Sequence, residues 1–111
     1  VDVSVDVGSE RYAPAVEAAA YFVISEALAN VTKYARATKA AVRVRGLDDH
    51  LSIEVEDDGI GGADPRSGSG LRGLADRLAA LDGTITVDSP IGGGTRISAQ
   101  IPIIQPMPAP V

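Results

Sequence analysis

Hydrophobic positions recur along this chain with two different periods, and each period predicts an element. Valines occupy every second position over residues 1–7 and alternate with Asp and Ser, which predicts a half-buried β-strand. From Pro14 to Ala35 the apolar positions recur every three or four residues, and the proline suits the first turn of a helix. The buried stripe of this predicted helix consists of Val16, Ala20, Val23, Ala27 and Val31.

The rest of the chain predicts four further strands and a second helix. Short apolar runs bounded by turn residues predict the strands, at residues 38–45, 51–56, 84–88 and 95–101, and the first two form a hairpin. Residues 71–81 predict an amphipathic helix whose inward side is Leu74, Leu78 and Leu81. The predicted fold class is α+β, a two-layer α/β sandwich with a mixed sheet of about five strands and helices packed on one face. We assign residues 1–102 to this domain and expect the proline-rich tail, residues 103–111, to be disordered.

Composition then excludes several classes of function. The 111 residues make one compact domain, and the net charge of −5 argues against a nucleic acid or an anionic membrane as partner. Because the chain has no cysteine and one histidine, disulfides, thiol catalysis and Cys- or His-rich metal sites are excluded. The sequence contains neither a membrane span nor a signal peptide, and its first residue is not methionine. We therefore expect a cytoplasmic domain cut from a longer protein.

Three polar residues of the first predicted helix could form a site for a cation and a phosphate. Glu26, Asn30 and Lys33 are spaced i, i+4 and i+7, which places them within about 60° of one another on one helix face. One interpretation is a solvated helix face with a Glu–Lys pair. The other is a site in which the Glu and Asn oxygens bind Mg²⁺, directly or through its waters, while the Lys contacts a phosphate.

A carboxylate followed by glycines ends the strand predicted at residues 51–56. In the segment Asp57-Asp58-Gly59-Ile60-Gly61, an Asp side chain could accept a hydrogen bond from an exocyclic amine such as that of adenine. The two glycines would let the backbone pass close to a flat ring. The segment is equally compatible with an ordinary Asp-Gly turn.

Two glycine-rich segments follow farther along the chain. Gly68-Ser69-Gly70-Leu71-Arg72-Gly73 opens the second predicted helix, where free N–H groups and the helix dipole favour an anion. It matches G-x-G-x-x-G, but a dinucleotide site needs a strand directly before this motif, and residues 63–67 cannot form one. Gly92-Gly93-Gly94-Thr95 is by itself compatible with a tight connection between strands. The sequence contains no P-loop motif.

The order of these motifs is more specific than any one of them. A helix with Glu-x-x-x-Asn-x-x-Lys, a strand ending in Asp-x-Gly-x-Gly, Gly-x-Gly-Leu opening a helix and Gly-Gly-Gly-Thr opening a strand together resemble the GHKL ATP-binding domain. This is the Bergerat fold of DNA gyrase, MutL and sensor histidine kinases, and the resemblance covers residues 14–102. Residues 70–78 are similar to the corresponding segment of histidine kinases that pair with nitrate-response-type regulators.

The resemblance implies a role for each matching residue. Asn30 would coordinate Mg²⁺, Glu26 would assist through the water shell of the metal, and Lys33 would contact phosphate. Asp57 would accept the hydrogen bond of the adenine amine, and Thr95 would help to hold the base through water. The residues implied to contact the nucleotide are Asn30, Lys33, Tyr34, Asp57, Gly59, Gly61, Gly68, Gly70, Leu71 and Thr95, with Tyr34 standing where many relatives have His.

The resemblance also implies partners and an activity. The chain would bind Mg-ATP and present the γ-phosphate to a phosphoacceptor histidine on a separate dimerisation domain, for relay to a response regulator. Its own histidine, His50, has no helical context, so the chain alone is not expected to phosphorylate itself. Two alternatives remain. One is another GHKL enzyme, either an anti-sigma serine kinase or an ATPase with Glu26 as general base. The other is a nucleotide-binding switch without phosphotransfer.

Overall fold

The computed structural model describes residues 2–8, 10–31, 37–47, 49–60 and 69–103. Within these ranges the chain forms five strands and two helices. In chain order they are β1 (Asp2–Val7), α1 (Pro14–Asn30), β2 (Lys39–Gly46), β3 (His50–Asp57), α2 (Ser69–Ala79), β4 (Thr84–Asp88) and β5 (Thr95–Pro102). The predicted helices and strands are all found within two residues of their predicted starts. Ala35, the predicted last residue of the first helix, lies outside the described residues.

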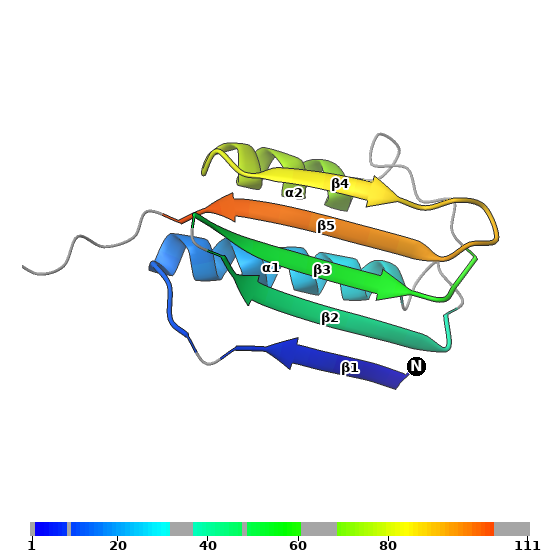
Figure 1. Cartoon of the computed structure of the whole chain (residues 1–111). Coiled ribbons are helices and arrows are strands. Elements are labelled where there is room, and N and C mark those ends of the chain that lie inside the picture. The colour runs from blue at the N-terminus through cyan, green and yellow to red at the C-terminus, as the bar shows by residue number, and fades with distance from the viewer. Residues whose placement is uncertain (1, 9, 32–36, 48, 61–68, 104–111) are drawn as a thin grey trace, which may run out of the picture.

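The strands form one mixed sheet in the order β1-β2-β3-β5-β4. β1 runs parallel to β2, and the other neighbouring pairs are antiparallel. Figure 1 shows both helices on the same face of the sheet, which leaves the other face open. This is the two-layer α+β sandwich that the sequence predicts. Neither α1 nor α2 has the length and hydropathy that a membrane-spanning helix needs.

The hydrophobic core lies between the sheet and the two helices. The stripe predicted for α1 is buried along its whole length, and Leu74 and Leu78 of α2 are 2% and 1% exposed. Alternate residues of the strands complete this core because successive side chains of a strand point to opposite faces. They include Leu51, Ile53 and Val55 of β3 and Ile97, Ala99 and Ile101 of β5.

The first strand differs from its prediction. It was expected to be half-buried, but every residue of β1 is exposed, including Val3 (46%), Val5 (64%) and Val7 (50%). The reason is its position in the sheet. β1 is an edge strand, whereas α1 packs over β3 and β5 and α2 packs over β4. The period-two pattern correctly predicted the strand, but no helix within the described residues covers it.

The last strand of the sheet ends one residue before the end of the described range. β5 ends at Pro102, and the N–H of Ile103 donates to the carbonyl oxygen of Asp49 at 3.0 Å. Beyond Ile103, the predicted tail lies outside the described residues.

Candidate nucleotide-binding site

The topology gathers the sequence motifs at one end of the sandwich. The C-terminal end of α1 leads towards the start of β2, and the antiparallel pairing of β2, β3 and β5 brings the start of β2, the end of β3 and the start of β5 side by side. α2 begins at this same end of the sheet (Figure 1). The segments carrying Asn30, Asp57 and Thr95 are therefore neighbours in the fold, although they span most of the sequence.

Asp57 has a fixed orientation at the end of β3. It continues the alternation of Leu51, Ile53 and Val55, so its side chain lies on the face of the sheet that the helices cover. Its Oδ1 accepts a hydrogen bond of 2.8 Å from the N–H of Gly59, which is an Asx turn. Its Oδ2 accepts none from any described residue. This carboxylate thus presents one oriented, unused acceptor to a ligand.

The start of β5 lies directly against Asp57. Thr95 is its partner in the β3–β5 register, and the Thr95 and Ser89 hydroxyls are 2.6 Å apart. Before it, Gly94 has φ +77°, and a Cβ at this position would overlap the carbonyl oxygen of Asp57. A side chain is therefore excluded at residue 94 on two grounds, the left-handed backbone and the close approach of β3.

Asp58 anchors the loop after β3, a role that the sequence did not reveal. Its carboxylate accepts hydrogen bonds from the Thr38 N–H (2.8 Å), the Thr38 hydroxyl (2.7 Å) and the Lys39 N–H (3.0 Å). These bonds, led by the Thr38 hydroxyl, lower the pKa of Asp58 from 3.8 to about 2. On the other side of the loop, the Gly92 N–H donates to the Ile60 carbonyl at 2.6 Å. Both attachments hold the segment that follows Asp57.

The predicted metal-binding pair lies on α1. Glu26 and Asn30 are both half-buried and stand one turn apart on the same side of the helix. Among the described residues no group of three or more acidic or histidine side chains is arranged so that it could hold a metal ion. Amide and carboxylate oxygens suit Mg²⁺, which commonly keeps several waters and takes further ligands from substrate phosphates. The pair therefore fits a cation delivered with a phosphate ligand rather than one enclosed by protein alone.

Several predicted site residues cannot be placed. Lys33, Tyr34, Gly61 and Gly68 lie outside the described residues. Gly70 and Leu71 belong to the first turn of α2, which begins at Ser69, two residues before its predicted start. Gly59 is buried in the loop after β3. The structure thus brings together Asp57, Gly59 and Thr95. Of the residues predicted to bind metal or phosphate, Glu26 and Asn30 lie on α1, and Gly70 and Leu71 lie at the start of α2.

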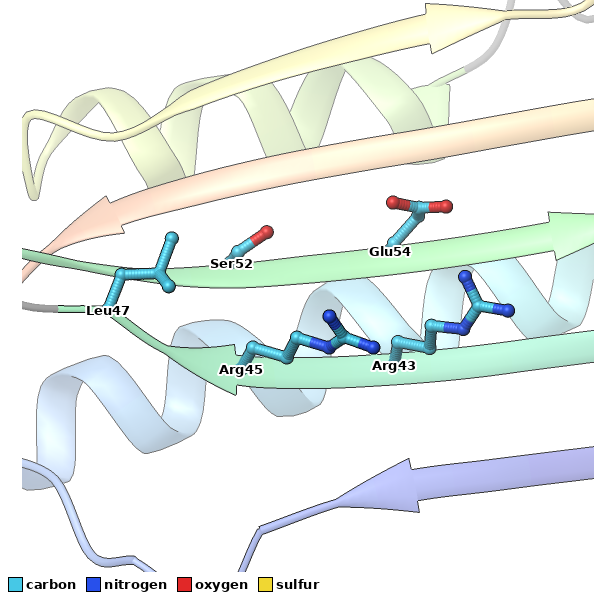
Figure 2. Close-up of a pocket in the computed structure, with 5 residues that line it drawn as sticks. All are labelled: Arg43, Arg45, Leu47, Ser52 and Glu54. Atoms are coloured by element: carbon cyan, nitrogen blue, oxygen red, sulfur yellow. The ribbon is translucent and has the colours of Figure 1, made fainter.

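A separate hollow of 250 Å³ lies away from this end (Figure 2). It is lined by Arg43, Arg45, Leu47, Ser52 and Glu54. The two arginines alternate with Val42 and Val44 on β2, so they point to the open face of the sheet, opposite the helices. The hollow is therefore not part of the site around Asp57.

Comparison with known proteins identifies a family. Residues 15–105 match the family described as histidine kinase-, DNA gyrase B-, and HSP90-like ATPase. The chain is 34% identical over 99 residues to the oxygen sensor histidine kinase NreB of Staphylococcus carnosus. It is 32% identical over 100 residues to the signal transduction histidine-protein kinase/phosphatase DegS of Bacillus subtilis. These alignments cover 86% and 85% of this chain but only 28% and 26% of the two relatives.

Solved structures share the fold. The histidine kinase domain of the blue-light activated histidine kinase of Erythrobacter litoralis EL346 superposes with a TM-score of 0.81 at 23% identity, over 92% of this chain and 51% of that one. The histidine kinase AdeS of Acinetobacter baumannii gives a TM-score of 0.76 at 19% identity, over 94% of this chain and 55% of that one. At these identities the likeness establishes the α+β sandwich alone.

Proposed function

Because the chain belongs to the histidine kinase-, DNA gyrase B- and HSP90-like ATPase family, we propose that it serves as the catalytic domain of a two-component sensor histidine kinase. At the level of the family, the predictions of an ATP-binding domain and of a histidine-kinase-type enzyme are confirmed. The proposal adds the activity of the whole protein. In this activity the γ-phosphoryl group of Mg-ATP would pass to a histidine on a separate dimerisation domain, and from there to a response regulator.

The observation that carries the proposal is the geometry of Asp57. One carboxylate oxygen accepts from the Gly59 N–H, and the other has no hydrogen-bond partner among the described residues. This carboxylate lies where Gly94 lets the neighbouring strand approach closely. An acceptor fixed in this way suits the exocyclic amine of adenine and would reject a base that presents a carbonyl oxygen there, because two acceptors would then face each other. Thr95, the register partner of Asp57, would contribute to the same base through water.

The remaining residues would handle the phosphates. Glu26 and Asn30 would hold Mg²⁺, which when bound offsets the charge on the phosphate oxygens. The first turn of α2 includes Gly70 and Leu71 and lies at a helix N-terminus, where backbone N–H groups have no partner within the helix and can bind an anion. Lys33 and Gly68 would also contact phosphate, and Tyr34 would be a further contact of the nucleotide. Gly59 and Gly61 would let the base lie against the loop. In this mechanism the domain positions the nucleotide, and the acceptor histidine comes from outside it.

The chain's own histidine does not suit the acceptor role. His50 is the first residue of β3, and its Nδ1 lies 2.6 Å from the Asp49 carboxylate in the β2–β3 connection. This is the end of β3 opposite to Asp57. We therefore expect that the chain alone binds Mg-ATP without phosphorylating itself, and that it functions in the cytoplasm. The similarity of residues 70–78 and the relative NreB favour the branch that pairs with nitrate-response-type regulators.

Calorimetric titration with Mg-ATP tests the proposal. We expect the wild-type chain to bind and the variant Asp57→Asn to lose binding. An Asn side chain that turns its NH₂ group toward the base places one donor against another, the adenine amine, so no hydrogen bond forms. Asp49→Asn, at the opposite end of β3, is the matched control and should bind normally. Equal binding by Asp57→Asn and wild type would contradict the assignment of Asp57. Steady release of inorganic phosphate by the chain alone would indicate an ATPase instead of a sensor kinase.

A further inference from the structure

No helix of the described residues covers the apolar surface beside the first strand, on the helix side of the sheet. Val3, Val5 and Val7 of β1 pair in register with Ala40, Val42 and Val44 of β2. Residues opposite each other in a ladder point to the same face of the sheet, and Ala40 and Val42 are buried core residues. The three valines therefore point toward the helix layer. They nevertheless remain about half exposed or more, so the hydrophobic face of the sheet continues past the helices that cover it.

One flank of α1 borders this strip of valines. In α1 the buried Val23 faces the sheet, Phe22 lies about 100° to one side of it and Ile24 about 100° to the other. Phe22 faces α2, because the Arg77 guanidinium of α2 stacks over its ring at 3.8 Å. The opposite flank, with Ile24 and with Leu28 one turn later, therefore faces away from α2 and toward β1. Both side chains are only half-buried.

These five residues, Val3, Val5, Val7, Ile24 and Leu28, form what we call the β1–α1 surface. The strip of this surface beside α1 is about as wide as one packed helix. α1 packs over β3, and β1 lies two strands away, which is about 10 Å at the usual strand spacing. Two packed helices lie about 8–10 Å apart. A helix placed next to α1 would thus rest on the valines of β1 with Ile24 and Leu28 at its side. Figure 1 shows that neither α1 nor α2 extends over β1.

We propose that an amphipathic helix from the same protein, outside residues 1–111, docks on the β1–α1 surface. It would carry apolar residues at i, i+3 or i+4, and i+7 toward the valines and polar residues on its outer side. A second copy of this chain is a poorer source of this helix, because the buried residues of α1 and α2 already pack against their own sheet. The relatives are long enough to supply such a helix, since this chain aligns with 28% and 26% of their lengths. The proposal goes beyond nucleotide binding and does not depend on it.

Cysteine accessibility tests this proposal, because the chain contains no cysteine of its own. Val5→Cys places a thiol in the middle of the β1–α1 surface. Ser4→Cys, one residue earlier, places it on the opposite face of the same strand and is the matched control. Each variant is made both in the 111-residue chain and in the longer protein that contains it. Alkylation by iodoacetamide is then followed by mass spectrometry of the peptide that carries the new cysteine.

We expect the Val5→Cys thiol to react roughly tenfold or more slowly in the longer protein than in the 111-residue chain, because the docked helix must open first. The Ser4→Cys thiol should react at the same rate in both. Equal rates for Val5→Cys in the two proteins would overturn the proposal. Protection of Val5→Cys in the 111-residue chain that grows with protein concentration would also overturn it, in favour of a second copy. Neither result would bear on the titration of Asp57→Asn.

Discussion

The close approach of β5 to Asp57 makes Gly94 a sensitive probe of the nucleotide-binding site. In Gly94→Ala the new methyl group would overlap the carbonyl oxygen of Asp57, and it would also lie 3.3 Å from the carbonyl carbon of Asp57 and 3.5 Å from Cα of Asp58. These are backbone atoms, so the strain cannot be relieved by rotating a side chain. The end of β3 must move, and the Asp57 carboxylate moves with it.

The expected magnitudes come from two separate effects. An alanine held at φ near +77° costs about 1–2 kcal/mol of folding stability. This corresponds to a decrease in Tm of about 4–8 °C for each kcal/mol. Displacement of Asp57 also removes the proposed hydrogen bond from the adenine amine to this charged acceptor. The loss costs about 1.5–3 kcal/mol of binding free energy and raises the Kd for Mg-ATP roughly tenfold to a hundredfold.

A neighbouring glycine separates the two effects. Gly92 has φ +79°, but a Cβ at this position would meet nothing within 4 Å. Gly92→Ala keeps the N–H that donates to Ile60 and should therefore lower the Tm by the backbone term alone. It should raise the Kd for Mg-ATP much less than Gly94→Ala does. Calorimetry at 25 °C and thermal unfolding of both variants give the comparison. If Gly94→Ala and Gly92→Ala bind Mg-ATP equally well, the close approach to Asp57 does not control the site and the reasoning is wrong.

Two further predictions concern the stability of the fold. Leu78→Ala removes a side chain that is 1% exposed and should destabilise the domain by about 2–5 kcal/mol. Leu47 is 50% exposed, so Leu47→Ala should cost about 0.5 kcal/mol or less. Similar urea midpoints for the two variants would contradict the assigned core. The folded-state pKa of Asp58 is lowered from 3.8 to about 2, so its stabilising contribution is complete above about pH 4 and is lost as the pH falls toward 2. Asp58→Ala should therefore lower the Tm near neutral pH, and this difference should disappear near pH 2. A difference that is constant across the range would show that the Asp58 charge is not involved.

Local patterns were sufficient to predict the elements and most of the core. A period of two predicted β1, apolar runs bounded by turn residues predicted the other strands, and a helical period predicted α1 and α2. These patterns are sufficient because each reflects the geometry of one element alone. The exposure of Val3, Val5 and Val7 could not be predicted in the same way. It depends on which helix covers which strand, and that is a property of the sheet order.

The two adjacent carboxylates illustrate a second limit of the sequence. Asp57 and Asp58 look equivalent in the sequence, but the alternation of β3 directs Asp57 toward the helix layer, while Asp58 reaches the start of β2. Nothing local identifies Thr38 as the partner of Asp58, since 20 residues separate them. The register of Asp57 with Thr95 and the overlap at Gly94 are likewise long-range, and they appear only once the strands are paired.

The position of β3 in the sheet has a consequence for how the nucleotide is bound. β3 is the central strand, with β2 on one edge and β5 on the other, so its amides are hydrogen-bonded within the ladder on both sides. Such a strand exchanges its amide protons only through the least frequent openings of a domain. Asp57 lies at the end of this strand, so under the proposed function its acceptor oxygen would be oriented before the nucleotide binds, at little cost in conformational entropy. Binding of the base would then begin on a preformed support.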